Sequence, residues 1–265
     1  MILNTVLTST NLHENYIDFI PNFINHWKKL FPEINVVIVL ISDHIPDKFL
    51  NYKDNIILYA NKLNKIPSAF QAMCIRNLYP CILENHGNIL ISDIDMMPMN
   101  RAYYENSIKT ASDTKFITYR DVLLPINEYP MCYNIANTNT WKEVFNIKSI
   151  TDIDNLLNIW YENSNYRIDN PSLTGIHNFD QKILFKSLQE FNQKTSNLVV
   201  LNDIICKYRR LDRLKTGSAD HVYVRDLFKN DEIRMDIKAG KFSDYHSLRP
   251  YNKYKYINNY ILNFL

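Results

Sequence analysis

Residues 87–99 read Gly-Asn-Ile-Leu-Ile-Ser-Asp-Ile-Asp-Met-Met-Pro-Met. The short apolar run after Gly87 is typical of a buried strand, and Asp93 and Asp95 stand where that strand would end. Residues two apart point to the same side of an extended chain, so both carboxylates would face one point, about 6 to 7 Å apart along the backbone. The following Pro98 cannot donate to a strand ladder, so we expect the strand to stop and the chain to turn near the two aspartates.

Two carboxylates held this close repel each other unless a cation lies between them, which favours a divalent metal with oxygen ligands. An isolated Asp-x-Asp pair is more often a solvated turn or a helix cap. This pair instead follows an apolar strand in the middle of the chain, and open α/β sheets bind their ligands at the carboxyl ends of such strands. The placement therefore favours a metal site.

The composition predicts one globular domain and excludes some classes of site. The chain has 265 residues, of which 46% are hydrophobic, and this is enough to bury a full core. A net charge of +2 gives no electrostatic argument for nucleic acid, so we expect no such partner. Four glycines are too few for a Gly-rich phosphate loop, so metal and side chains must hold any phosphate. The cysteines lack metal-type spacing and are expected to be free thiols: Cys74, Cys81, Cys132 and Cys206.

No stretch of the sequence predicts a membrane-spanning or secreted protein. The longest apolar run, residues 36–41, is too short to cross a bilayer, and the first residues lack the basic and apolar regions of a signal peptide. We therefore expect a soluble cytoplasmic protein without a transmembrane segment. The tail at residues 251–265 is rich in Tyr and Ile, and the alternatives for it are a solvated helix with tyrosines packed beneath it or peripheral contact with a membrane or a glycan.

The first hundred residues follow the β-α-β-β order of a Rossmann-like half sheet. The polar Thr8-Ser9-Thr10-Asn11 reads as a turn and helix cap after the first strand, and Pro21 marks a kink or late start of the first helix. The predicted elements are strands at 2–7, 36–41 and 56–59, and helices at 16–31 and from Pro67-Ser68 to Leu83.

Several polar residues of the later elements have both a structural and a functional interpretation. Arg76 lies in the helix before the Asp-x-Asp strand. It is either a surface residue or a residue whose guanidinium donates hydrogen bonds to a diphosphate. Asn134, after Tyr133, could read sugar hydroxyls from a strand end, and Asp180 alone would be an ordinary partner of a helix dipole. The further elements are a strand at 115–119 and helices at 141–145, 150–161 and one opened by residues 175–184.

These motifs together resemble glycosyltransferases of the GT-A fold, most nearly the branch that contains glycogenin and the bacterial lipopolysaccharide galactosyltransferases. The resemblance rests on the Asp-x-Asp, the preceding Arg76, Tyr133-Asn134, Phe179-Asp180-Gln181 and a late His246-x-x-x-Pro250. It implies an α/β fold in a single domain over 1–265, with a mixed, mostly parallel central sheet flanked by helices. Residues 1–100 would be the nucleotide-binding half and 101–250 the acceptor and sugar half.

The resemblance also implies a role for each matching residue. Asp93, Asp95 and His246 would bind the metal, which would be Mn²⁺ or, less comfortably, Mg²⁺. Asp180 and Gln181 would meet the donor sugar and the reacting face. Ile135-Ala136 stands where the family usually has Ala-Gly. The implied donor-binding residues are Thr8, Ser9, Thr10, Arg76, Asp93, Asp95, Tyr133, Asn134 and Arg249.

The predicted activity is transfer of a sugar from a nucleotide diphosphate, expected to be UDP, to a hydroxyl of a glycan, glycoprotein or other acceptor. Negative charge grows on the departing diphosphate, where a metal with Arg76 or Arg249 would stabilise it. The resemblance favours retention of configuration. Two alternatives stay open: a haloacid-dehalogenase-like phosphatase, which also uses Asp-x-Asp after a strand, and a non-catalytic binding module for carbohydrate or sugar nucleotide.

Overall fold

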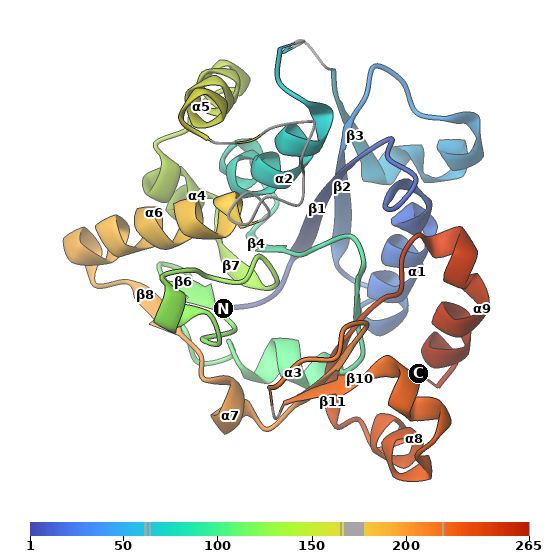
Figure 1. The fold of residues 1–265 in the computed structure, drawn as a ribbon. Coiled ribbons are helices and arrows are strands. Elements are labelled where there is room, and N and C mark those ends of the chain that lie inside the picture. Colours follow the sequence, from blue (N-terminus) through green and yellow to red (C-terminus); the bar gives the residue numbers. More distant parts are fainter. Residues whose placement is uncertain (61–62, 64, 165, 167–177, 219, 265) are drawn as a thin grey trace.

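The computed structural model describes residues 1–60, 63, 65–164, 166, 178–218 and 220–264. Within these residues the chain forms two β-sheets with helices packed around them (Figure 1). The strands are β1 (Thr5–Asn11), β2 (Asn35–Ile41), β3 (Ile56–Tyr59), β4 (Asn88–Ile91), β5 (Met96–Pro98), β6 (Phe116–Thr118), β7 (Asn134–Asn137), β8 (Leu198–Val200), β9 (Arg209–Asp212), β10 (His221–Tyr223) and β11 (Phe242–His246).

The larger sheet has seven strands among the described residues, in the order β3-β2-β1-β4-β7-β6-β8. Strands β3, β2, β1 and β4 are parallel, whereas β7 runs antiparallel to both β4 and β6. The chain moves outward from β1 to β2 and β3 on one side, and then returns to place β4 on the other side. This confirms the predicted α/β fold with a mixed, mostly parallel sheet, and it makes the carboxyl ends of β1 and β4 the topological switch point.

Helices cover both faces of this sheet. The α-helices are α1 (Ile20–Leu30), α2 (Ser68–Leu78), α3 (Arg101–Asn106), α4 (Thr138–Phe145), α5 (Ile150–Asn163), α6 (Phe179–Thr195), α7 (Asp203–Cys206), α8 (Asp231–Lys238) and α9 (Tyr251–Leu262). The 3-10 helices are η1 (Ile17–Phe19), η2 (Asp47–Asn55), η3 (Tyr79–Ile82), η4 (Leu124–Ile126) and η5 (Val224–Phe228).

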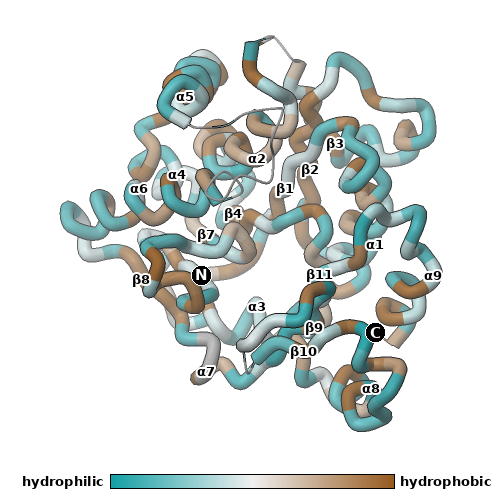
Figure 2. The backbone as a smooth tube through the Cα atoms, viewed as in Figure 1, coloured by the Kyte–Doolittle hydropathy of each residue, from teal (hydrophilic) through white to brown (hydrophobic). Residues whose placement is uncertain are grey.

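The alternation of side chains along the central strands builds two separate cores. Val6 and Ile38 face the core that includes α1, whereas Leu7 and Val39 face the core that includes α2, α4, α5 and α6. In Figure 2 the tube is brown over much of β2, which is buried along most of its length, and largely teal along α6, which buries only a few of its residues. Trp27 of α1 is fully buried in the first core, where its ring packs on Tyr104 at a centroid distance of 5.0 Å.

Most elements of the first half confirm their predictions. The helix expected at 16–31 begins with η1 and continues as α1 with Pro21 in its first turn, which is the late start. The helix opened by Ser68 begins as predicted but ends at Leu78 and not at Leu83, and Pro80 lies in the 3-10 helix η3 that follows it. In the part of the chain that the structure describes, the four cysteines are thiols that form no disulfide, as expected.

Two local predictions are wrong. Thr8 to Asn11 do not form a turn and a helix cap, because β1 continues through them to Asn11 beside β2. The side chains of Ser9, Thr10 and Asn11 find hydrogen-bond partners within the fold, as when the Ser9 hydroxyl donates to the Ala72 carbonyl at 2.5 Å. The expected extended backbone at the two aspartates is also wrong. The strand ends at Ile91, just before Asp93 as predicted, the chain turns over residues 93–96, and Met96–Pro98 form β5 at the edge of the second sheet, where a missing donor is tolerated.

The second sheet, in the order β10-β9-β11-β5, has no counterpart among the sequence predictions. It lies below the main sheet in Figure 1, near α3 and α8. Strand β11 pairs antiparallel with β5, which sets His246 opposite Met96 and brings the late part of the chain next to the Asp-x-Asp segment. The predicted aromatic tail is the helix α9, which buries Tyr251 and leaves Tyr256 82% exposed. Among the described residues, no helix is long and apolar enough to cross a membrane.

Candidate functional site

The site lies at the switch point between β1 and β4. The Ser92 backbone N–H donates to the Leu7 carbonyl at 3.0 Å, so the chain leaves β4 beside β1 before it reaches the two aspartates. Asp93 and Asp95 follow in a turn, closed by a hydrogen bond from Met96 N–H to the Asp93 carbonyl at 3.1 Å. The aspartates are therefore not aligned by the alternation of an extended strand, and each pairs with different basic side chains.

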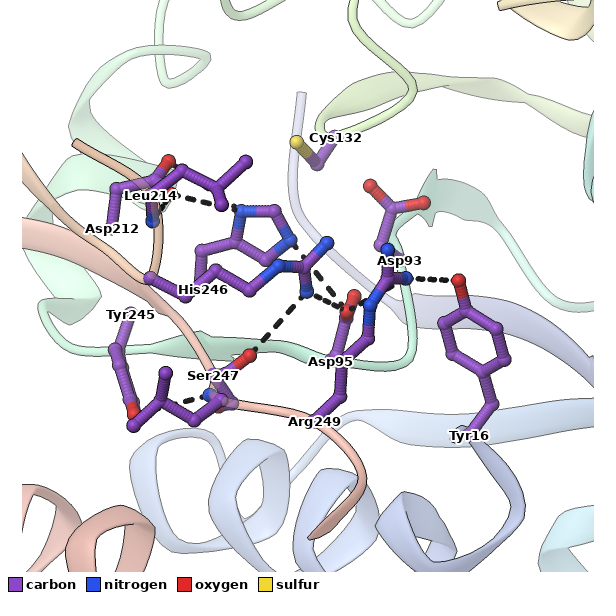
Figure 3. A network of polar contacts seen from close by, with 12 residues as sticks. Tyr16, Asp93, Asp95, Cys132, Asp212, Leu214, Tyr245, His246, Ser247 and Arg249 are labelled. Atoms are coloured by element: carbon purple, nitrogen blue, oxygen red, sulfur yellow. Dashed lines mark hydrogen bonds and ion pairs between the residues drawn. The ribbon is translucent and has the colours of Figure 1, made fainter. Parts of the chain in front are cut away.

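Asp95 is buried and lies at the centre of a cluster of basic groups. Its Oδ2 atom lies 3.6 Å from His246 Nε2 and 3.8 Å from Arg249 Nη1, and it also accepts a hydrogen bond from Arg213 Nη1 (Figure 3). The Asp95 carbonyl accepts from Ser247 N–H at 2.8 Å, which fixes the turn against the end of β11. Burial by itself would raise the pKa of Asp95, but the Arg213 guanidinium and His246 outweigh it and lower this pKa far below its usual range.

His246 lies between two carboxylates. Its Nδ1 is 3.4 Å from Asp212, and its Nε2 faces Asp95 (Figure 3). Burial acts to lower the pKa of His246, but the two carboxylates prevail and raise it. Burial likewise acts to raise the pKa of Asp212, whereas its hydrogen bond to His246 and the charge of that ring bring it down to about 2. Asp212 therefore orients the imidazole so that Nε2 points toward Asp95.

Arg249 lies at the more open side of the cluster. Its side chain is 36% exposed, its guanidinium stacks over the Tyr16 ring at 4.9 Å, and it donates to the Tyr16 hydroxyl. Burial raises the pKa of Tyr16, with a further contribution from Asp95 that Arg249 partly offsets. This arrangement presents a partly solvated guanidinium next to Asp95.

A second cluster joins Asp93 to the first turn of α6. Arg76 of α2 donates to Asp93 through Nη1 and to Asp180 Oδ2 through Nη2, the latter at 2.7 Å. Asp180 is 1% exposed, and its other oxygen accepts from Gln181 N–H at 2.9 Å. Burial raises the pKa of Asp180, although Arg76 opposes this. The Gln181 Oε1 atom is buried and has no hydrogen-bond partner among the described residues.

The remaining predicted site residues are more deeply embedded. Thr8, Ser9 and Thr10 are buried within β1, where the Thr8 hydroxyl has no partner among the described residues. Tyr133 is fully buried, and its ring meets that of Tyr104 at 5.0 Å.

The Asn134 amide is used by the protein itself. Its Nδ2 donates to the carbonyls of Pro130 at 2.7 Å and Met131 at 3.2 Å, and its Oδ1 accepts from Thr118 Oγ1 at 2.8 Å. These contacts give Asn134 a structural role, as the packing of Tyr133 does for that residue. The assignment of both residues to a donor sugar stays a prediction. Of the segment expected to open α6, Gly175 to His177 lie outside the described residues.

The predicted metal ligands are partly assembled. Asp95 and His246 supply a carboxylate and an imidazole at 3.6 Å, and Asp212 supports the other nitrogen of the ring, which is the usual setting of a metal-bound histidine. Asp93 points to Arg76 instead. Among the described residues, no three His, Cys, Asp or Glu side chains gather as a ready metal site. The donor chemistry thus fits a divalent cation, with Asp93 the ligand that would have to change its partner.

Sequence reasoning missed Arg213, Asp212 and the buried charges behind them. Arg210 Nε donates to Asp244 at 2.7 Å inside the second sheet, and Arg120 is 2% exposed and pairs with Asp220 at 2.7 Å. The only sequence feature that pointed to these residues was the high density of charged side chains at 209–213. Such a segment is ordinarily interpreted as exposed to solvent.

The sequence matches no family model and no curated protein. Among solved structures, it is similar to GlyE, a glycosyltransferase of Streptococcus pneumoniae TIGR4, at 12% identity and a TM-score of 0.50, covering 99% of this chain and 63% of that chain. It is similar to WbbM, a bifunctional glycosyltransferase, at 12% identity and a TM-score of 0.52, covering 98% of this chain and 49% of that one. An active-site mutant of LgtC matches at 10% identity, a TM-score of 0.48 and coverages of 97% and 95%.

The chain thus spans under two thirds of GlyE and about half of WbbM. At these identities the likeness establishes a shared architecture. The chain therefore has the predicted GT-A fold, which it shares with these glycosyltransferases.

Proposed function

We propose that the protein is a metal-dependent glycosyltransferase that moves a sugar from a nucleotide diphosphate, most simply UDP, to a hydroxyl of a glycan or other acceptor. One observation carries the proposal. A buried carboxylate at the switch point of a GT-A fold, Asp95, meets an imidazole and a partly exposed guanidinium that come from the far end of the chain. Such a cluster suits a diphosphate, because charge-assisted donors and a cation can share its oxygens.

Different residues of the site act on different groups of the reactants. The bond from the anomeric carbon to the phosphate oxygen breaks and its electron pair stays on the diphosphate. The acceptor oxygen bonds to the carbon and passes its proton to an oxygen of the departing diphosphate. Arg249 donates to the diphosphate oxygens on which the charge grows. Gln181 Oε1, which has no hydrogen-bond partner in the described part of the chain, accepts from a sugar hydroxyl. A bound Mn²⁺, held by Asp95 and His246 with Asp93, would supply Lewis-acid stabilisation of the same charge.

The environment of Asp180 supports the expectation of retention. A general base for inversion must reach the acceptor proton, either directly or through one water. Asp180 is 1% exposed and its carboxylate is bound by Arg76 and by the Gln181 N–H, so it serves to orient these neighbours. We therefore propose that the anomeric configuration of the product matches that of the donor, which proton NMR of the product would establish.

Ligand-induced stabilisation tests the proposal directly. The thermal unfolding midpoint would be measured with UDP-, GDP- and CMP-sugars, each with and without Mn²⁺. We expect a Mn²⁺-dependent rise with a UDP-sugar, because a ligand that binds only the folded state stabilises it by mass action. Asp95→Asn should lose this rise. Asp54→Asn, which removes an exposed acid of η2, is the matched control and should keep it.

Turnover separates the rival functions. Release of UDP with formation of a glycoside indicates a transferase, whereas binding without turnover indicates a carbohydrate or nucleotide binding module. Release of inorganic phosphate from a phosphomonoester would indicate the phosphatase. No stabilisation by any of the three donors at saturating concentration, with or without Mn²⁺, would remove the basis of the proposal.

A further inference from the structure

Arg213 is the residue of the site that neither motif nor spacing pointed to. It follows directly after β9, next to Asp212, and its Nη1 donates to Asp95 Oδ2 and, at 3.4 Å, to the Ser247 carbonyl. The side chain is 12% exposed, and that of Asp95 is 4% exposed. A guanidinium is therefore held at the carboxylate that the proposed metal needs.

The contacts of Arg213 leave much of its binding capacity unused. Among the described residues, no protein group accepts from its Nε or Nη2. A guanidinium with so little exposure normally has most of its five N–H groups bonded. Its one charged partner, Asp95, is also approached by His246 and Arg249 on the same oxygen. Three basic groups thus converge on a single carboxylate oxygen, and their positive charge favours a further anion.

A metal ion and Arg213 compete for Asp95 Oδ2, because a dication at this oxygen would add strong repulsion to the guanidinium that already binds there. Arg213 would leave when the metal binds. Its backbone position is fixed by β9 and by the Leu214 N–H, which donates to Asp212 Oδ1 at 2.9 Å, so the guanidinium moves by side-chain rotation and stays at the site. The nearest partner of matching geometry is then the diphosphate, which a guanidinium binds through two parallel hydrogen bonds.

We infer that Arg213 is a diphosphate-binding residue that pairs with Asp95 in the free protein and transfers to the donor's diphosphate when a divalent cation takes its place. The inference deepens the proposed function and rests on it for the identity of the donor. Arg213 therefore affects the affinities for two ligands in opposite directions. Arg213 competes with the metal in the absence of nucleotide, and it assists the diphosphate once the metal is bound.

The test measures both affinities on the whole chain. Mn²⁺ binding without nucleotide would be followed by the electron paramagnetic resonance signal of free Mn²⁺, and binding of UDP and of inorganic pyrophosphate at saturating Mn²⁺ by calorimetry. In Arg213→Gln, Mn²⁺ should bind about tenfold more tightly, whereas UDP and pyrophosphate should bind about tenfold more weakly, as expected for a coupling of this kind. Arg225→Gln, which removes an exposed arginine of η5, is the matched control and should change neither affinity.

A second variant guards against loss of folding. Arg213→Lys keeps the charge without the fork, so it should retain the competition with Mn²⁺ and still bind pyrophosphate more weakly than the wild type. Weakening of both ligands would show a merely structural role, and unchanged affinities would show no role; each result overturns the inference. Failure of the proposed function has a different signature: pyrophosphate and Mn²⁺ respond to Arg213 as stated, but no sugar nucleotide binds.

Discussion

Replacement of Arg76 by methionine should expose how the two aspartates of the second cluster depend on one guanidinium. Arg76 is 13% exposed at its side chain and bridges Asp93 to Asp180, which is 1% exposed. Methionine fills a similar volume but leaves the Asp180 charge buried without its partner. Removing one member of a buried ion pair costs about 3 to 5 kcal/mol, so we expect Arg76→Met to lower the free energy of unfolding by roughly that amount.

A double-mutant cycle distinguishes this cause from lost packing. Asp180→Asn removes the buried charge, so the double variant Arg76→Met/Asp180→Asn should be more stable than Arg76→Met alone, by about 2 kcal/mol. Urea unfolding followed by circular dichroism at pH 7 gives the four free energies, provided that the dependence on urea concentration stays the same. Costs that simply add would refute the reasoning, because independent packing defects are additive whereas a shared ion pair is not.

Three further predictions concern stability elsewhere in the fold. Burial lowers the pKa of His26 to about 4, so the unfolded chain binds more protons than the folded chain between pH 6.5 and 4. The folded state therefore loses up to about 3 kcal/mol of stability as the pH falls through this range. The urea midpoint of His26→Gln should depend less on pH than that of the wild type. Gly87→Ala should cost about 1 to 3 kcal/mol in urea unfolding, because φ is +67° and the new Cβ would lie 2.4 Å from Asn4 Oδ1. Ser149→Ala removes the capping box with Asp152 at the start of α5. The loss should reduce the free energy of unfolding by about 1 kcal/mol and lower the thermal midpoint accordingly. An unchanged midpoint would mean that the cap does not stabilise the fold.

The buried strands and main helices were predictable because their signal is local. The apolar run of β2 and the run before Asp93 each require burial on both faces, and a parallel sheet with helices on both sides is the structure that supplies it. The caps and breakers act over one turn, which is why Pro21 and Ser68 located helix starts correctly. A polar run has no such single interpretation: Thr8 to Asn11 read as a turn, yet they form part of β1, and Ser9, Thr10 and Asn11 find hydrogen-bond partners inside the fold.

By itself, the sequence determined the α/β class, the order of the first strands and the place of Asp93 and Asp95 after a buried strand, since hydrophobic periodicity acts through neighbouring residues. Only the tertiary structure decided which basic groups meet those carboxylates. Arg213 is 118 positions from Asp95, and the second sheet that carries it consists of strands of three to five residues with buried charges. Strands this short show no detectable hydrophobic periodicity. The ion pairs across the sheet join residues that only the folded chain brings together.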